Sequence, residues 1–300
     1  MAGSNGKMVD TATKAGQGPT VWRRGLKILV LAALFGWLLV EVYPILFLFF
    51  TSFKTNEQIL NTPFALPSAL SLDNYITVWK GERTNQPFAY FFRNSVIVTA
   101  GTLLLLLAVA SLAGYALARG RFPGSTAVQQ SFLLSLAVPA HVLLIPIFFF
   151  MDRLGLRNSL WGLILVYTTL GLPFTVLMMR AYFLSFPREL EEAAMLDGCT
   201  RLGTFWRIVV PVSKGALASM AIVNINWIWS ELFFALILVN RLDKRTLPLA
   251  IASYSPVAMS SESTIAGQFA AMALATIPMI VVFFLFQRQI SKGMTMGAFR

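Results

Sequence analysis

The stretch Glu191-Glu192-Ala193-Ala194-Met195-Leu196-Asp197-Gly198-Cys199-Thr200 is a short charged segment in a chain that is otherwise strongly apolar. Pro187 suits the first turn of a helix, where its missing N–H costs nothing, and Ser185 is placed to cap that helix. Gly198 is placed to end the helix with a left-handed residue. A second short helix is expected to begin near Arg201. The pattern predicts a rigid helix–turn–helix at a membrane surface, in a loop that spans about residues 181–211.

The composition of the whole chain is that of an integral membrane protein. Of its 300 residues, 57% are hydrophobic and 12% are charged, whereas soluble domains carry about a quarter charged residues. The net charge of +11 is scattered between apolar runs and forms no basic stripe interleaved with aromatic residues, so no nucleic-acid partner is indicated. One cysteine, Cys199, excludes an internal disulfide and any multi-cysteine metal site, and the sequence holds one histidine.

Several apolar runs are long enough to cross a bilayer, which takes about 20 residues each. The predicted spans lie at about 23–53, 93–117, 129–151, 159–180, 213–240 and 267–287. Pro44 is expected to kink or end the first span. Residues 1–22 are expected to form a flexible cytoplasmic tail, and residues 23–300 one membrane domain. With both termini in the cytoplasm, the cytoplasmic segments hold more Lys and Arg than the opposite segments, which supports this orientation.

The charged segment resembles the cytoplasmic coupling loop of importer-type ABC permeases, the membrane subunits that dock on a separate ATPase. The resemblance rests on E-A-A-x-x-D-G at Glu192–Gly198, followed by Phe205, Ile208 and Pro211. It implies an all-α membrane protein of about six transmembrane helices, with the type I ABC importer permease fold and a cytoplasmic coupling helix. The residues that it assigns to ATPase docking are Glu192, Ala193, Ala194, Asp197, Gly198 and Phe205.

The resemblance covers nearly the whole chain after the tail. The sequence is similar in particular to the maltose-type second permease of carbohydrate importers. It includes Gly114-Tyr115-Ala116-Leu117-Ala118-Arg119 and, near the C-terminus, Gly293-Met294-Thr295-Met296-Gly297-Ala298. In that family the C-terminal tail, about 288–300 here, reaches the interface between the two ATPase subunits. Relatives often end with a basic residue and then a glycine, whereas this sequence ends at Arg300.

The resemblance also implies the partners. They are an ABC ATPase dimer carrying ATP and Mg, a second and different permease subunit, an extracytoplasmic solute-binding protein, and a sugar or oligosaccharide substrate in a bacterial or archaeal cytoplasmic membrane. The chain itself has no G-x-x-x-x-G-K-[ST] phosphate loop and no recognisable nucleophile–base motif. We therefore expect a transport subunit with no catalytic residue, metal or cofactor of its own.

The predicted fifth span holds a second group of candidate residues, because polar groups in hydrocarbon usually face protein or a cavity. These are Asn224, Asn226, Trp227, Ser230 and Glu231. Asn226 with Ser230, and Trp227 with Glu231, are four residues apart and can share a helix face. Such a span offers the hydrogen-bonding groups and aromatic faces that a sugar pathway needs. Packing between helices is the alternative for this group, and the roles of Glu41 and His141 stay open.

A stand-alone secondary transporter or channel driven by an ion gradient is the alternative function. It predicts internal repeats and buried ionisable coupling sites. The sequence shows no repeat, and Glu41 and Glu231 are its main candidates for such ionisable groups. This alternative also leaves the charged segment at Glu192 without an explanation.

Overall fold

The computed structural model describes residues 20–82, 85–120, 122–254 and 265–296, and the regular structure within them is helical throughout. The chain divides into two compact units, Met1–Phe50 and Thr51–Arg300. The first unit is described from Thr20 onward and consists of most of helix α1 (Thr20–Ser52). Helix α1 confirms the first predicted span, but Pro44 lies inside it and does not end it. Residues 1–19 of the predicted tail lie outside the described residues.

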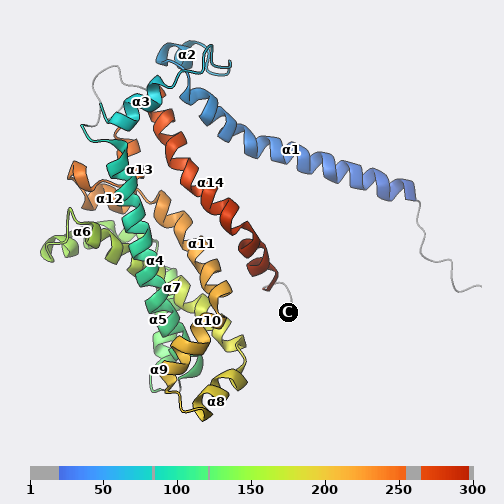
Figure 1. Ribbon diagram of the computed structural model, residues 1–300, viewed down its shortest axis with the longest axis vertical. Coiled ribbons are helices and arrows are strands. Elements are labelled where there is room, and N and C mark those ends of the chain that lie inside the picture. The colour runs from blue at the N-terminus through green and yellow to red at the C-terminus, as the bar shows by residue number, and fades with distance from the viewer. Residues whose placement is uncertain (1–19, 83–84, 121, 255–264, 297–300) are drawn as a thin grey trace, which may run out of the picture. The chain divides into compact units, whose positions relative to one another are not determined.

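The second unit has short helices at its two ends and longer helices between them (Figure 1). Its first half contains α2 (Asn56–Asn61), α3 (Asp73–Lys80), α4 (Phe88–Arg119), α5 (Ser125–Leu136), η1 (Ala140–Leu143), α6 (Leu144–Arg153) and α7 (Leu160–Ser185). Its second half contains α8 (Arg188–Leu196), α9 (Arg201–Thr204), η2 (Phe205–Val209), α10 (Val210–Val212), α11 (Lys214–Ser230), α12 (Phe233–Leu238), η3 (Leu242–Lys244), α13 (Leu247–Ala252) and α14 (Ile265–Met296).

Among the described residues, four helices are long and apolar enough to cross a membrane. They are Gly25–Ser52, Phe88–Arg119, Leu160–Ser185 and Ile265–Gln287. Two bent pairs raise the number to six if each pair counts as one span: Ser125–Leu136 with Ala140–Arg153, bent by 95°, and Arg201–Val212 with Lys214–Ser230, bent by 74°. The predicted all-α architecture with about six spans agrees with this arrangement.

The predicted spans 129–151 and 213–240 are not single helices, and each break has an identifiable cause. Pro139 has no backbone N–H to continue α5, and the residues before it close the helix with tight bonds from Ala137 N to Leu134 O (3.1 Å) and Val138 N to Ser135 O (3.3 Å). Glu231 is extended (φ −67°, ψ 127°) and ends α11. Its carboxylate then accepts the first free N–H groups of α12, from Phe234 and Ala235.

Helices α4 and α7 pack along one another at the centre of the second unit, and glycine allows their closest approach. A Cβ atom on Gly114 of α4 would lie 2.9 Å from the backbone nitrogen of Arg180 and 3.1 Å from the carbonyl oxygen of Val176, both in α7. Leu106, Ala110 and Val176 are fully buried around this contact. The two helices therefore meet backbone against backbone, which makes them one rigid layer.

The ends of the second unit carry different structures (Figure 1). Helices α2 and α3 lie at one end, and α8 and α9 lie at the other. At the α2–α3 end, the Lys54 side chain is buried, and its ammonium group donates to the carbonyl oxygens of Pro63 (2.8 Å) and Thr62 (3.3 Å). The Asn74 amide donates to the carbonyl oxygens of Ser52 and Lys54, both at 2.9 Å. Side chains that donate to backbone carbonyls thus hold the α2–α3 end together.

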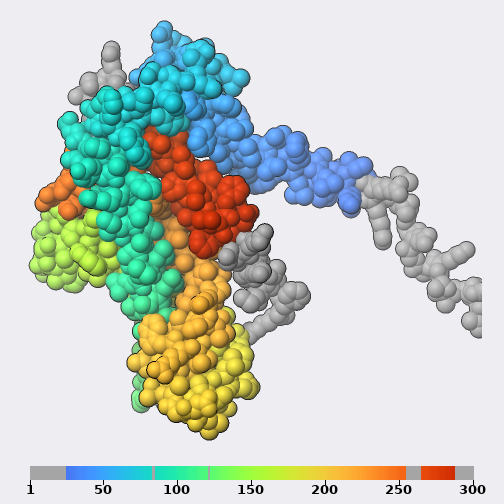
Figure 2. All heavy atoms as spheres, in the orientation of Figure 1, coloured from blue at the N-terminus to red at the C-terminus, as the bar shows by residue number. Residues whose placement is uncertain are grey.

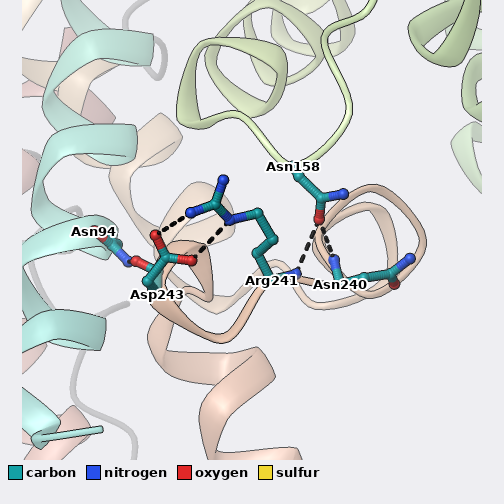
Figure 3. A network of polar contacts seen from close by, with 5 residues as sticks. All are labelled: Asn94, Asn158, Asn240, Arg241 and Asp243. Atoms are coloured by element: carbon teal, nitrogen blue, oxygen red, sulfur yellow. Dashed lines mark hydrogen bonds and ion pairs between the residues drawn. The ribbon is translucent and has the colours of Figure 1, made fainter.

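The segment between α12 and α13, residues 239–246, is held by asparagine side chains of other elements (Figure 3). Asn158, in the turn before α7, accepts bonds at Oδ1 from the backbone nitrogens of Asn240 (2.6 Å) and Arg241 (2.9 Å). Asn94 of α4 donates from Nδ2 to the carbonyl oxygens of Asp243 (2.9 Å) and Arg245 (3.0 Å). The hydrogen bonds from Arg241 hold the pKa of the Asp243 carboxyl below its usual range. Side chains thus fix the path of the segment 239–246.

Candidate functional site

Helix α8 is the centre of the first candidate site, and its ends follow from local chemistry. Pro187 occupies the N-cap position (φ −59°), directly before the first turn of the helix in which it was predicted. Ser185 does not cap α8, because it is the last residue of α7 and its hydroxyl donates to the Tyr182 carbonyl oxygen (2.7 Å). At the other end, Gly198 has a φ of +85°, and Gly198 N and Cys199 N donate to the carbonyls of Met195 and Ala194. The predicted left-handed end at Gly198 is confirmed.

The second helix of the segment begins at Arg201, as predicted, and it contains an irregular turn. The Thr200 hydroxyl oxygen accepts a bond from Gly203 N (3.1 Å), so Thr200 is a side-chain N-cap. Residues Phe205–Val209 form a π turn in which Val210 N donates to Phe205 O, five residues back. Pro211 follows directly and has no N–H to give to the preceding turn. The π turn thus widens the helix where the proline breaks the regular bonding pattern.

The predicted docking residues divide between an outer and an inner face of this segment. Glu192, Ala193, Asp197 and Gly198 are exposed, and the segment forms the uncovered lower end of the second unit, in yellow, in Figure 2. Ala194 and Phe205 point inward instead, since their exposed fractions are 7% and 0%. In this structure Phe205 packs on Tyr115 and Phe183. Ala194 and Phe205 therefore support the exposed surface from beneath and are not part of it.

A buried polar cluster beneath α8 was not predicted from the sequence. Arg119, at the end of α4, donates from Nε to Glu191 Oε1 (2.8 Å) and from Nη2 to the carbonyl oxygen of Phe186 (2.6 Å). The Tyr115 hydroxyl donates to Glu191 Oε2 (2.8 Å). The side chains of Arg119 and Glu191 are only 13% and 8% exposed. Helical spacing offered a signal, because Glu191 lies three residues before the inward Ala194 and so shares its face.

A cavity of about 730 Å³ opens beside this cluster. It lies between the last turn of α4 and helices α8 and α9, and its lining includes Tyr115, Arg119, Glu191, Glu192 and Arg201. Apolar side chains such as Leu112 of α4 and Phe205 of η2 complete the wall. The end of the unit that carries α8 is therefore both protruding and hollowed, with charged groups of both signs at the hollow.

The second candidate site, in α11, is largely a network of bonds within the chain. Asn224 is buried (1% exposed) and donates from Nδ2 to Thr175 Oγ1 (3.2 Å) and the Met220 carbonyl oxygen (2.8 Å). Its Oδ1 accepts a bond from the indole nitrogen of Trp227 (3.0 Å). Glu231 accepts bonds from the Tyr167 hydroxyl, Phe234 N and Ala235 N. Asn224 and Glu231 thus fix neighbouring elements.

Asn226 and Ser230 differ from this network because both are exposed. They lie on one face, as predicted, and the Ser230 hydroxyl donates to the Asn226 carbonyl oxygen (2.9 Å). Asn226 and Ser230, with the partly exposed Trp227, are therefore the members of the predicted set that are open to a ligand or a partner. The sequence grouped five residues, and the structure separates them into supporting and accessible members.

A second cavity, of about 310 Å³, lies where the two helix breaks meet. Its lining includes His141 from η1, Trp227 and Glu231 from α11 and its end, and Phe174 from α7. His141 packs edge to face on Phe233, the first residue of α12, with ring centroids 4.9 Å apart. The break after α5 and the break after α11 therefore contact each other through His141 and Phe233.

Known proteins are similar to this chain in sequence and in fold. Residues 108–296 match the family described as "Binding-protein-dependent transport system inner membrane component". The chain is 33% identical over 265 residues to the probable ABC transporter permease protein YurM of Bacillus subtilis, covering 88% of this chain and 86% of the relative. It is 31% identical over 269 residues to the diacetylchitobiose uptake system permease protein NgcG of Streptomyces coelicolor, covering 90% and 87%.

A third relative and one solved structure agree with these matches. The multiple sugar-binding transport system permease protein MsmG of Streptococcus mutans is 33% identical over 259 residues, covering 85% of this chain and 90% of the relative. The crystal structure of a bacterial ABC transporter that imports the acidic polysaccharide alginate has a chain with a TM-score of 0.77, at 23% identity, covering 92% of this chain and 99% of that chain.

The fold and the sequence together define a multi-pass membrane subunit of a binding-protein-dependent importer. The chain belongs to the family of binding-protein-dependent transport system inner membrane components, the permease subunits of ABC transporters. This confirms the predicted permease fold and a transport role in place of an enzymatic one. The gradient-driven secondary transporter is not favoured, because the relatives that match this chain over most of its length are ABC permeases.

Proposed function

We propose that this permease subunit carries a sugar or an oligosaccharide into the cell after an extracytoplasmic binding protein delivers it. The support comes from its relatives, since NgcG and MsmG are permeases for diacetylchitobiose and for multiple sugars. A transporter with a similar chain was solved in complex with an alginate pentasaccharide-bound periplasmic protein, with a TM-score of 0.64 at 16% identity. We further propose that a second, different permease completes the membrane pathway.

The single observation that carries the proposed mechanism is the exposed face of α8. Glu192, Ala193, Asp197 and Gly198 stand at one end of the second unit on a short helix closed by a left-handed glycine. We propose that this end lies in the cytoplasm, together with both termini, and docks on an ABC ATPase dimer that holds ATP and Mg. Rigid-body motion of the ATPases then moves α8 and switches the pathway between its outward and inward states.

The docking role is tested with Glu192→Lys, which reverses the charge on the exposed face. We expect the variant to insert in the membrane but to lose copurification with the ATPase and to lose uptake, because the partner-facing charge is wrong. Glu57→Lys is the control, since Glu57 is also an exposed glutamate and lies on α2 at the opposite end. Normal ATP-driven uptake by Glu192→Lys would refute the docking role.

The substrate class is tested by purifying the complex gently from its native membrane and identifying the copurified chains by mass spectrometry. The binding protein found with it is then screened against mono-, di- and oligosaccharides by thermal shift. Stabilisation by a sugar supports the proposal. A binding protein that responds to amino acids or peptides but to no sugar would refute it.

The pathway assignment is tested separately with Asn226→Leu. If α11 lines the pathway, loss of this exposed amide raises the KM for uptake of the identified sugar while assembly is retained. Thr169→Val is the matched control, because Thr169 is an exposed polar residue of α7 whose hydroxyl bonds only to its own helix, at Leu165 O. Unchanged uptake kinetics in Asn226→Leu would assign this residue to packing.

A further inference from the structure

Two neighbouring glutamates of α8 face in opposite directions. Glu192 is exposed, whereas Glu191 has an exposed fraction of 6%. Glu191 uses both carboxylate oxygens, one for Arg119 and one for Tyr115. The helix that offers a surface to a partner is therefore also fixed, one residue away, to the end of α4.

The groups that bond α8 to α4 are far apart in the sequence. This link is therefore separate from the chain connections that join α8 to α7 and α11. Helix α8 follows α7 directly and leads through α9 into α11, so movement of α8 reaches those helices along the chain. Arg119 is separated from Glu191 by 72 residues and from Phe186 by 67. The bonds of Arg119 and Tyr115 thus add a direct polar connection from α8 to α4.

Stability alone gives a weak reason for a charged pair at this place. Both partners are largely removed from water, and replacing such a pair by apolar side chains of similar volume is often neutral or stabilising. Charge-assisted bonds do have defined directions and lengths. Arg119 joins α4 to the carboxylate of α8 and to the carbonyl of Phe186 at once, so it fixes the distance and the angle between the two helices.

Helix α4 continues from this connection to the other end of the unit. Near its C-terminal end, α4 is in close contact with the backbone of α7 at Gly114. At its far end, Asn94 holds the carbonyls of Asp243 and Arg245, and the Ser95 hydroxyl oxygen accepts a bond from Leu247 N (2.8 Å). One helix of 32 residues therefore connects the α8 end with the segment 239–247.

We propose that Glu191 and Arg119 are positioning residues that deliver movement of α8 to α4, so that ATP-driven motion at the docking surface reaches the opposite end of the permease. The inference rests on the proposed docking function and adds the route by which the movement enters the membrane domain. Tyr115 supports it by holding the second carboxylate oxygen of Glu191.

The test is the double variant Arg119→Met with Glu191→Met in the complete transporter, reconstituted in liposomes with its ATPases, second permease and binding protein. Methionine fills the space without the directed bonds. We expect normal copurification and basal ATP hydrolysis, with uptake per ATP lowered about tenfold or more. Arg157→Met with Asp152→Met is the control, because that ion pair has a similar length (2.9 Å, against 2.8 Å for Arg119 and Glu191) but lies in α6 and the turn after it.

Two results would overturn the inference. Wild-type uptake per ATP in the double methionine variant would show that packing alone connects α8 to α4. Loss of the ATPase from the purified complex would show that the pair serves assembly. Failure of the docking proposal is distinguishable, because it is judged from Glu192→Lys, where Arg119 and Glu191 are intact.

Discussion

Gly198 shows how one backbone angle shapes the docking segment. Its φ of +85° is in the left-handed region, and a Cβ atom there would meet nothing within 4 Å, so conformation and not space opposes a side chain. We expect Gly198→Val to cost about 1–2 kcal/mol or more locally, because β-branched residues strongly disfavour this region. The variant should lose ATPase copurification and uptake.

Gly198→Asn is the matched control, since asparagine tolerates left-handed angles far better than valine. We expect it to retain most of the uptake lost in Gly198→Val. If valine at this position supports full uptake and assembly, the left-handed end of α8 has no role in docking.

The residues around Gly198 also show where prediction from sequence stops. The motif indicated a helix, its left-handed end and the start of the next helix, because those depend on neighbours in the chain. It could not assign Glu191 to the interior, since its partner Arg119 belongs to a helix 72 residues earlier. Ala194 and Phe205 were likewise grouped with the docking residues, although both are buried and Phe205 packs against α4 and α7.

At the scale of elements, the segment 239–246 depends on Asn158. Its φ is +54°, and its Oδ1 accepts two backbone bonds from that segment. We expect Asn158→Ala to lower the free energy of unfolding of the purified subunit by about 1–3 kcal/mol. The two backbone N–H groups lose their acceptor, and alanine disfavours a positive φ. Asn158→Asp keeps an acceptor at the same position and should unfold close to the wild type.

Equal unfolding temperatures for Asn158→Ala and the wild type would contradict this role of Asn158.

The stability of the segment 239–246 also depends on pH, through the carboxyl group of Asp243. The lowered pKa of Asp243 means that its bond with Arg241 favours the folded state above the ordinary carboxyl pKa, and that this contribution is lost as the pH falls through the lowered value.

The sequence predicted where the long helices lie better than it predicted where they break. Apolar runs located every long helix, and yet prolines gave no reliable sign of a break. Pro44, Pro173 and Pro278 lie inside continuous helices, whereas the break near Pro139 interrupts a predicted span. The break at Glu231 has no proline, and it depends on a carboxylate that caps α12 and bonds to Tyr167 of α7. Such tertiary partners are not visible in a local pattern.

At the scale of the whole molecule, burial is concentrated on one helix. The most apolar stretch of α7 is 56% buried within the chain, compared with 33% for α4 and 17% for α14. Helix α7 is therefore the central element of the second unit, with α4, α5 and α11 packed on it. We propose that the remaining apolar faces contact lipid and the partner subunits of the transporter.

The bent pair α5–α6 has a consequence for how the chain is made. At 1.5 Å per residue, the 12 residues of α5 and the 10 of α6 measure about 18 and 15 Å, well short of a bilayer core of about 30 Å. Neither half is a stable span alone, and backbone groups at the bend need cover from protein. Part of that cover is α12, whose first residue, Phe233, packs edge to face on His141 beside the bend, with ring centroids 4.9 Å apart. We therefore expect this corner of the permease to stay incomplete during synthesis until α12 has left the ribosome, and a chain that stops earlier to expose the bend to membrane proteases and chaperones.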